Sequence, residues 1–261
     1  MPYTLVNIII MKVIQLKLTV IGCWGGYPAP GESTSAYMIE KNNFTLLIDL
    51  GSGSLSTLQN YKNVMDIDAV IISHYHSDHI ADIGVLQYAW LTQSYLTSSE
   101  EILPIYGHMD DENNFLKLTH DFTEGISYNP NATLKIGPFT ISFLKAKHSV
   151  PCYGMRISDG YKSIVYTADT SYQEDWIEFS KNADLLITDC NFYANQDGSR
   201  AGHMTSEEGG KIAEAAKVKE LLLSHLPQYG EHNQLINEAS NFFKGSISLA
   251  KTGFVWESKH D

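Results

Sequence analysis

The hydrophobic and polar positions in the first half of the chain alternate over short runs, which is typical of half-buried β-strands. Asn42 and Asn43 separate two such runs and predict a tight hairpin turn. The first half is therefore expected to form a hairpin-rich sheet. Its predicted strands are Val13 to Ile21, Ser35 to Glu40, Thr45 to Asp49, Ala69 to Ser73, Ile102 to Gly107 and Phe139 to Lys145. The predicted helices are a short one over Leu55 to Tyr61 and an amphipathic one over Ile80 to Thr92.

The second half alternates strands with helices. The predicted strands are Ser163 to Thr167, Leu185 to Thr188, Leu221 to Ser224 and Ser246 to Ala250. The predicted helices are Trp176 to Ser180, Thr205 to Val218 and Asn233 to Phe243. Thr205 and Glu208 form a T-x-x-E capping box at the start of a helix. His148, Asp169 and His225 each follow an apolar strand, and strand ends that meet at one edge can bring their side chains into a single cleft.

A dense cluster of candidate metal ligands follows the apolar, β-branched run Ala69 to Ser73. His74, His76, Asp78 and His79 lie within six residues. Imidazole and carboxylate together suit zinc, and also iron or manganese. His74 and His76 can project to one side of an extended backbone, whereas Asp78 and His79 begin the next helical pattern. This division suggests two neighbouring ions.

Length and composition fit one large domain over 11–261. The chain has 261 residues, and Met11 directly precedes the first well-patterned strand, so residues 1–10 are expected to be an upstream extension. Whether Met1 or Met11 is the start residue stays open. The net charge of −12 opposes nonspecific attraction to nucleic acid without excluding a nucleic-acid substrate.

The cysteines and the apolar N-terminus bear on location. The three cysteines are widely spaced and odd in number, which does not resemble a disulfide framework, so a reducing cytoplasm is the expected location. Lys12 and Lys17 interrupt the apolar N-terminus, so we expect no membrane span and no membrane partner.

The pattern H-x-H-x-D-H after a buried strand resembles the signature of the metallo-β-lactamase fold. That resemblance implies a four-layer αββα sandwich with a dinuclear metal site. One ion would be held by His74, His76 and His148, the second by Asp78, His79 and His225, and Asp169 would bridge them. A water between two divalent ions has its pKa lowered toward ~7, so hydroxide would be the nucleophile, and Asp78 would orient it or take its proton.

Four further segments resemble ribonuclease Z, the phosphodiesterase that matures the 3′ ends of transfer RNA. They are Lys147 to Ile157, Tyr166 to Ser171, Ala183 to Tyr193 and Gly202 to Ala216. His203 matches a ribonuclease Z histidine outside the metal shell. The resemblance implies that it donates a proton to the leaving oxygen or stabilises the phosphate, which suits the near-neutral pKa of imidazole. Related enzymes are often dimers, so the resemblance makes a homodimer one candidate for the oligomeric state, which stays open.

Three departures from ribonuclease Z affect the grip on substrate more than the metal chemistry. Only a short turn fits between Arg156 and Asp169, where ribonuclease Z commonly inserts an arm that grips tRNA. Gln228 stands where a phosphate-binding arginine is expected, and the family's Gly-Glu-Gly is replaced by Gly-Ser-Gly at 51–53. The cations that would supply phosphate attraction are scattered along the chain, namely Lys145, Lys147, Arg156 and Arg200.

These observations predict a zinc-dependent phosphodiesterase acting on an RNA 3′ end or on a small or cyclic phosphodiester, with manganese or iron as alternative metals. A hydrolase of a carbonyl ester, lactone, thioester or β-lactam is a rival, because the same hydroxide attacks carbonyl carbon. A non-catalytic metal-binding module is the third interpretation. His108 and His120 are expected to be surface or local structural histidines, and Asp49 either orders its loop or is a plain turn carboxylate.

Overall fold

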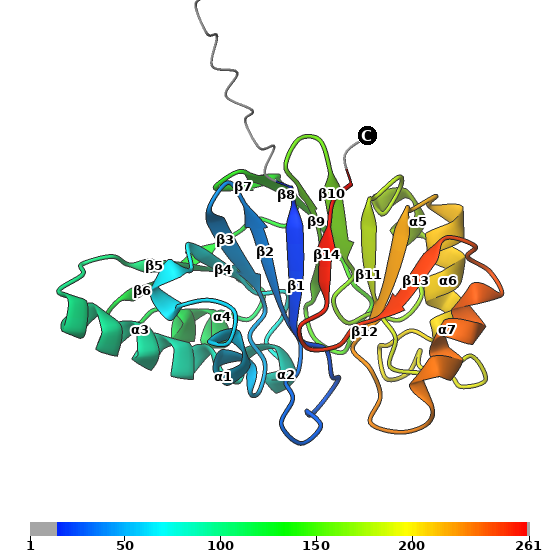
Figure 1. Cartoon of the computed structure of the whole chain (residues 1–261), viewed down its shortest axis with the longest axis horizontal. Coiled ribbons are helices and arrows are strands. Elements are labelled where there is room, and N and C mark those ends of the chain that lie inside the picture. Colours follow the sequence, from blue (N-terminus) through cyan, green and yellow to red (C-terminus); the bar gives the residue numbers. More distant parts are fainter. Residues whose placement is uncertain (1–14, 260–261) are drawn as a thin grey trace, which may run out of the picture.

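Two seven-stranded sheets face each other at the centre of the computed structural model, which describes residues 15–259 (Figure 1). The first sheet has the order β14-β1-β2-β3-β4-β5-β6, and the second has the order β13-β12-β11-β10-β9-β8-β7. The strands of the first sheet are β1 (Lys17–Gly22), β2 (Ala36–Lys41), β3 (Phe44–Ile48), β4 (Ala69–Ile71), β5 (Leu103–Gly107), β6 (Thr123–Ser127) and β14 (Val255–Glu257). Those of the second are β7 (Leu134–Ile136), β8 (Phe139–Lys145), β9 (Tyr153–Ser158), β10 (Ser163–Tyr166), β11 (Leu185–Asp189), β12 (Glu220–Ser224) and β13 (Ser246–Leu249).

Helices flank both sheets and complete the predicted αββα sandwich. In Figure 1, α3 lies beside the first sheet, while α6 and α7 lie beside the second. The helices are α1 (Ser54–Leu58), α2 (Ser77–Ile80), α3 (Ile83–Thr97), α4 (Glu112–Phe115), α5 (Asp175–Phe179), α6 (Ser206–Ala215) and α7 (His232–Ser240), with 3₁₀ turns η1 (Val64–Asp66) and η2 (Leu116–Leu118). The predicted capping box is confirmed, since the side chains of Thr205 and Glu208 each accept a bond from the other's backbone N–H.

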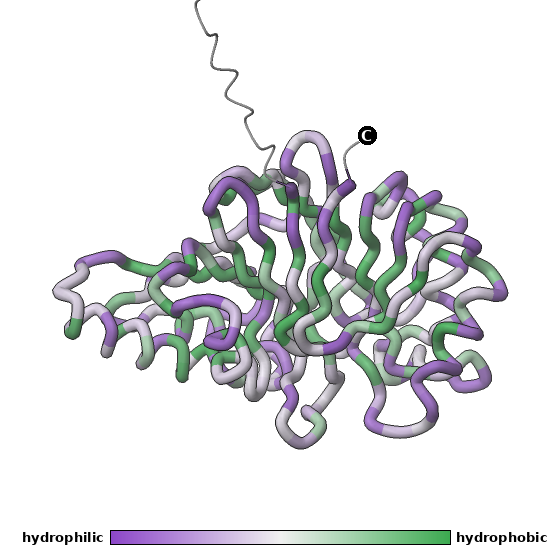
Figure 2. Tube along the Cα trace, viewed as in Figure 1, coloured by the Kyte–Doolittle hydropathy of each residue, from purple (hydrophilic) through white to green (hydrophobic). Residues whose placement is uncertain are grey.

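The layers follow from the period of two in the strands. In β3, Leu46 and Ile48 belong to the core cluster that joins the two sheets, whereas Leu47 between them belongs to the cluster that contains Leu86 and Trp90 of α3. Figure 2 shows hydrophobic segments along the central strands and hydrophilic ones along many of the loops. Strand β3 is therefore buried on both faces, whereas the alternation predicts strands that are only half-buried.

The β2–β3 hairpin agrees closely with the sequence. Asn42 and Asn43 have φ values of 52° and 65°, the left-handed conformation that a two-residue hairpin turn requires. The first strand begins later than predicted, at Lys17 among the described residues. Val13, the proposed extension 1–10 and the proposed start at Met11 lie outside the described residues. From residue 15 to 259, no helix is both long and apolar enough to cross a membrane.

The predicted amphipathic helix Ile80 to Thr92 is wrong in its bounds and in its character. The backbone N–H of Asp82 donates to the carbonyl of Leu50 at 3.0 Å instead of continuing α2, so α3 starts only at Ile83 and then runs to Thr97. Its inner face is buried, but apolar side chains also cover part of its outer face. The exposed ones are Val85, Tyr88, Tyr95 and Leu96.

Candidate metal centre

The predicted ligands come from four loops at one edge of the two sheets. His74 and His76 follow β4, and Asp78 and His79 lie in the single turn of α2. The second sheet supplies the other three after three of its strands, namely His148 after β8, Asp169 after β10 and His225 after β12. The structure brings all seven side chains together in two groups that share Asp169. A third group with ligand atoms equally close joins Asp169 and His225 to Asp189 and His203.

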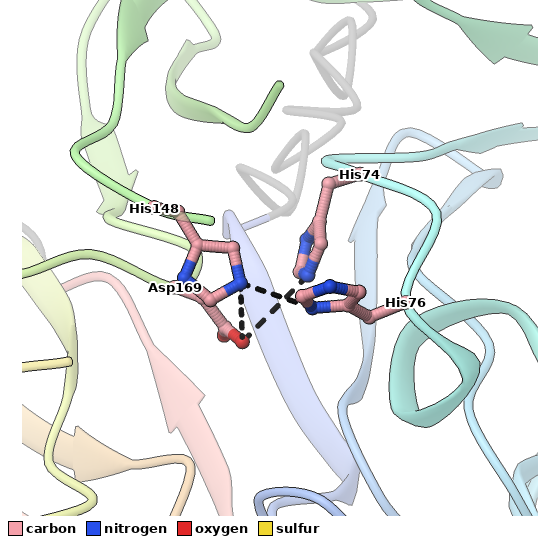
Figure 3. A group of neighbouring side chains, drawn as sticks. All are labelled: His74, His76, His148 and Asp169. Atoms are coloured by element: carbon pink, nitrogen blue, oxygen red, sulfur yellow. Dashed lines mark hydrogen bonds and ion pairs between the residues drawn. The ribbon is translucent and has the colours of Figure 1, made fainter. Parts of the chain in front are cut away.

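The first group consists of His74, His76, His148 and Asp169 (Figure 3). His74 Nε2 lies 3.6 Å from Asp169 Oδ2, and His148 Nε2 lies 3.8 Å from the same oxygen. His148 Nε2 and His76 Nδ1 are 3.0 Å apart. All the candidate ligand atoms of this group lie within 4.8 Å of one another, which is close enough for one ion to contact them together.

The second group consists of Asp78, His79, His225 and Asp169, and all four side chains are buried. His225 Nε2 lies 3.1 Å from Asp78 Oδ2 and 3.3 Å from Asp169 Oδ2. His79 Nε2 lies 3.1 Å from Asp169 Oδ1. Asp169 therefore presents one carboxylate oxygen to His79 and the other to His74, His148 and His225.

Orphaned polar atoms indicate that these residues fit a metal. Buried polar groups are nearly always hydrogen-bonded. Yet the Nε2 atoms of His74 and His79 and the Oδ1 atom of Asp169 are buried without a hydrogen-bond partner. They converge on the shared centre, and imidazole nitrogen with carboxylate oxygen suits a divalent ion such as zinc. The donor set thus fits divalent metal ions.

Buried partners hold the second ring nitrogen of two of these histidines. Asp49 Oδ2 accepts from Nδ1 of His79 at 2.8 Å, and Asp49 also accepts from the backbone and hydroxyl of Ser73, both at 2.7 Å. Nδ1 of His148 donates to the carbonyl oxygen of Gly202 at 2.9 Å. Such bonds fix the tautomer and leave Nε2 free to bind a metal. Asp49 thus orders a candidate ligand as well as the backbone at Ser73.

His203 lies beside the metal groups and is held by Asp189, a residue that the sequence analysis did not single out. Nδ1 of His203 donates to Asp189 Oδ2 at 2.7 Å, and the same oxygen accepts from the backbone of Thr170 at 3.0 Å. The ring centroids of His203 and His225 are 5.0 Å apart. One available signal for Asp189 was its position at the end of the apolar strand β11, the placement already used for Asp169 and His225.

Asp189 and His203 shift each other's pKa in opposite directions. Burial alone would lower the pKa of His203, but the adjacent Asp189 carboxylate outweighs burial, and the net shift is upward. Burial alone would raise the pKa of Asp189, but His203 reverses that effect and the net shift is downward. Because Asp189 holds Nδ1, Nε2 is the nitrogen that can reach a bound molecule.

A cavity of about 290 Å³ opens onto these residues. Besides five of the candidate ligands and His203, it is lined by Gly25, Gly26, Tyr27, Ser149, Asn191, Ala201 and Gln228. None of the four predicted phosphate-attracting cations is among the lining residues. Arg156 instead donates to the carbonyl oxygens of Phe179 and Lys181 at 3.0 and 3.1 Å, so its guanidinium has a structural role.

Two other predictions concern positions near the site. The turn between β9 and β10 is short, as expected, and Asp159 Oδ1 accepts from the backbone of Tyr161 at 2.9 Å. His108 is fully buried against Tyr75, with ring centroids 4.6 Å apart, so it is a local structural histidine and the surface alternative is wrong. His120 is half-buried beside the ring of Tyr88.

The family follows from a comparison with known proteins. The model of the Beta-lactamase superfamily domain matches residues 45–226. The chain belongs to this superfamily. It is 55% identical over 243 residues to Probable metallo-hydrolase YhfI of Bacillus subtilis (strain 168), covering 93% of this chain and 100% of the relative. The crystal structure of YhfI superposes with a TM-score of 0.93 at 54% identity, covering 94% of this chain and 100% of YhfI.

More distant relatives include ribonuclease Z enzymes. Ribonuclease Z of Metallosphaera sedula is 24% identical over 92% of this chain and 99% of the relative. Human tRNase Z, short form, shares the fold with a TM-score of 0.73 at 20% identity, covering 92% of this chain and 98% of that chain. The resemblance to the metallo-β-lactamase fold, drawn from the ligand motif, and the resemblance to ribonuclease Z, drawn from four further segments, are confirmed.

Proposed function

We propose that this protein is a dinuclear metal-dependent hydrolase that cleaves small phosphodiesters. The observation that carries the proposal is His203, which Asp189 holds in the wall of a pocket that also exposes both groups of candidate ligands. The proposed metal is zinc, with manganese or iron as alternatives. One ion would be held by His74, His76 and His148, the other by Asp78, His79 and His225, with Asp169 shared.

Divalent ions at these residues would supply Lewis acidity and lower the pKa of a water toward ~7. Asp78 would orient the attacking water or take its proton. As the new bond to phosphorus forms and the bond to the leaving oxygen breaks, His203 would transfer its Nε2 proton to that oxygen. The Asp189 carboxylate holds the imidazole in the orientation needed for this transfer and stabilises its positive charge.

The pocket supports a small substrate over structured RNA. Its volume of about 290 Å³ lies just below the range of roughly 300–1,000 Å³ for small-molecule sites. The net charge of −12, the short β9–β10 turn and the absence of lysine and arginine from the lining residues all oppose a grip on a long polyanion. YhfI supports a metallo-hydrolase, and the ribonuclease Z relatives support phosphodiester chemistry.

The test combines metal analysis with a substrate panel. Protein made without chelators is analysed by mass spectrometry for bound metals and then assayed on bis(p-nitrophenyl) phosphate, carbonyl esters, a lactone, a thioester, a β-lactam and unprocessed tRNA. We expect two ions per chain, turnover of the phosphodiester, and loss of turnover on chelation. His203→Ala should lower kcat about 10²- to 10⁴-fold, the usual contribution of a general acid. His120→Ala, which alters a histidine that does not line the pocket, is the control.

The other outcomes contradict the proposal in distinct ways. Faster turnover of carbonyl esters would favour the rival hydrolase, and efficient processing of tRNA would favour an RNA substrate. Full metal occupancy with no turnover on any substrate would leave a metal-binding module. Unchanged phosphodiester turnover in His203→Ala would remove the proposed acid.

A further inference from the structure

The turn Gly25–Tyr27 brings an exposed aromatic ring to the wall of the pocket. All three residues of the turn line the cavity beside Asp78 and His225. The side chain of Tyr27 is 63% exposed, so a large planar apolar surface is accessible next to the candidate metal ligands. Exposed aromatic groups at a pocket wall are available for stacking against a ligand.

Bonds from both halves of the fold hold the backbone of this turn. Gln228 Nε2 donates to the carbonyl oxygens of Gly25 and Tyr27, the latter at 2.6 Å. The N–H of Gly26 donates to Asp78 Oδ2 at 2.7 Å, and the N–H of Gly25 donates to the carbonyl of Leu226 at 3.1 Å. The turn is therefore tied to a candidate metal ligand on one side and to the loop after β12 on the other.

Glycine is required at the first two positions of the turn for different reasons. A Cβ at Gly25 would lie 2.4 Å from Asn191 Nδ2 and 2.7 Å from the ring of His225, so only glycine fits there. Gly26 has a φ of +71°, which other residues rarely adopt. The two glycines thus define the backbone from which the Tyr27 side chain starts, and Tyr27 lines the pocket with most of its surface exposed.

We propose that Tyr27 is a specificity-determining residue that stacks on the base of a nucleoside phosphodiester, and that Gln228 positions it. The inference rests on the proposed function. A phosphodiester at the candidate ligands places its substituents along the pocket walls, and a nucleoside carries a planar aromatic base that Tyr27 can cover. A phosphodiester of glycerol or another alkyl alcohol has no such surface.

The proposal also gives Gln228 a role. Gln228 stands at one of the departures from ribonuclease Z, where that family is expected to bind phosphate with an arginine. In this chain the side-chain NH₂ of Gln228 is engaged by two backbone carbonyls. Gln228 therefore contributes to the recognition of a substrate through the Tyr27 turn, without a positive charge.

The experiment compares adenosine 5′-monophosphate with ribose 5-phosphate, which differ only in the base. Both are measured as competitive inhibitors of bis(p-nitrophenyl) phosphate turnover and, independently, by calorimetric titration of the metal-loaded protein. We expect wild type to bind the nucleotide more tightly. Tyr27→Ala should weaken nucleotide binding about 5- to 150-fold, as expected for a lost base stack, and change ribose 5-phosphate binding less than about twofold.

Matched variants separate stacking from structure. Tyr27→Phe keeps the ring and should bind like wild type, and Tyr161→Ala removes a tyrosine that is 91% exposed in the β9–β10 turn and should change nothing. Gln228→Met removes the donor at similar length and should weaken nucleotide binding in the same direction as Tyr27→Ala. Gln59→Met, on the exposed end of α1, is its control. In the double variant Tyr27→Ala with Gln228→Met the two effects should not add, because both act through one ring.

Failure of the inference and failure of the proposed function give different results. Equal affinity of wild type for the two phosphates, or an additive double variant, would overturn the role of Tyr27 or Gln228 while phosphodiester turnover continued. Absence of turnover would refute the proposed function, and calorimetry would still decide whether the turn recognises a base.

Discussion

Asp49 makes a separable contribution to stability and to metal affinity, which substitution can test. Its carboxylate is fully buried and accepts four bonds, two from Ser73 and one each from His79 and Tyr166. Asp49→Ala removes every acceptor and leaves these groups unpaired. We expect it to lower the free energy of unfolding by about 3–5 kcal/mol, as for other broken buried charge pairs.

Asp49→Asn should act differently because its shape is retained. An amide keeps one oxygen for the Ser73 backbone N–H, and the hydroxyls of Ser73 and Tyr166 can accept from its NH₂ group. Nδ1 of His79 cannot adapt without moving its proton to Nε2, the atom that faces Asp169 at 3.1 Å. The affinity for the ion held by Asp78, His79 and His225 should therefore fall about 10- to 100-fold, or about 1.4–2.7 kcal/mol.

The assay for Asp49→Asn is a competition titration of metal-free protein against a chromophoric chelator, accompanied by urea unfolding. Asp184→Asn is the control, since Asp184 is also buried and accepts a backbone bond from Ser163 at 2.8 Å, but belongs to none of the candidate metal groups. An Asp49→Asn protein with unchanged metal affinity would refute the tautomer argument. A loss of affinity in Asp184→Asn of the same size would show that any buried carboxylate has this effect.

Two further predictions concern packing and pH. A Cβ at Gly51 would lie 2.0 Å from the carbonyl oxygen of Asp78. In urea unfolding, Gly51→Ala should therefore lower the free energy of unfolding by about 1–3 kcal/mol. The control is Gly84→Ala on α3, where a Cβ meets no atom within 4 Å and should not be destabilising. Equal free energies of unfolding for the two variants would contradict the close packing at Gly51. Burial, reinforced by Glu32, raises the pKa of Cys23 to about 12, above the ~8.5 of an unfolded thiol. Between these pH values only the unfolded chain loses this proton, so the free energy of unfolding should fall by about 1.4 kcal/mol per pH unit, and Cys23→Ser should remove that share of the slope. If the free energy of unfolding fell equally steeply with pH in wild type and in Cys23→Ser, the raised pKa of Cys23 would be refuted.

The sequence was informative where one local pattern determines the outcome. The period of two places Leu46 and Leu47 on opposite faces of β3, and the paired asparagines specify the hairpin. The ligand motif was informative because imidazole and carboxylate side chains at such density are typical of metal sites. His148, Asp169 and His225 were assigned through the family resemblance, which the position of each after an apolar strand supported.

The remaining features depend on contacts between distant segments. Tyr166 bonds Asp49 across 117 positions, and no local pattern reports such a pairing. The break before α3 arises because Leu50 accepts the N–H of Asp82, so helical spacing alone predicted a continuous helix. Asp189 was missed although it ends the apolar strand β11, because its role depends on the bond to His203, which the strand pattern does not show.

The candidate ligands are divided between the two sheets, so a bound ion would connect the two halves of the fold. His74, His76, Asp78 and His79 belong to the first sheet's loops, whereas His148, Asp169 and His225 belong to those of the second. An ion held by both sets is a reversible cross-link between the layers, and an ion that binds only the folded chain at 1,000 times its Kd adds about 4.1 kcal/mol to stability. Metal binding and the stability of the sandwich are then linked, so removal of the ion would lower the free energy of unfolding and also abolish the proposed activity.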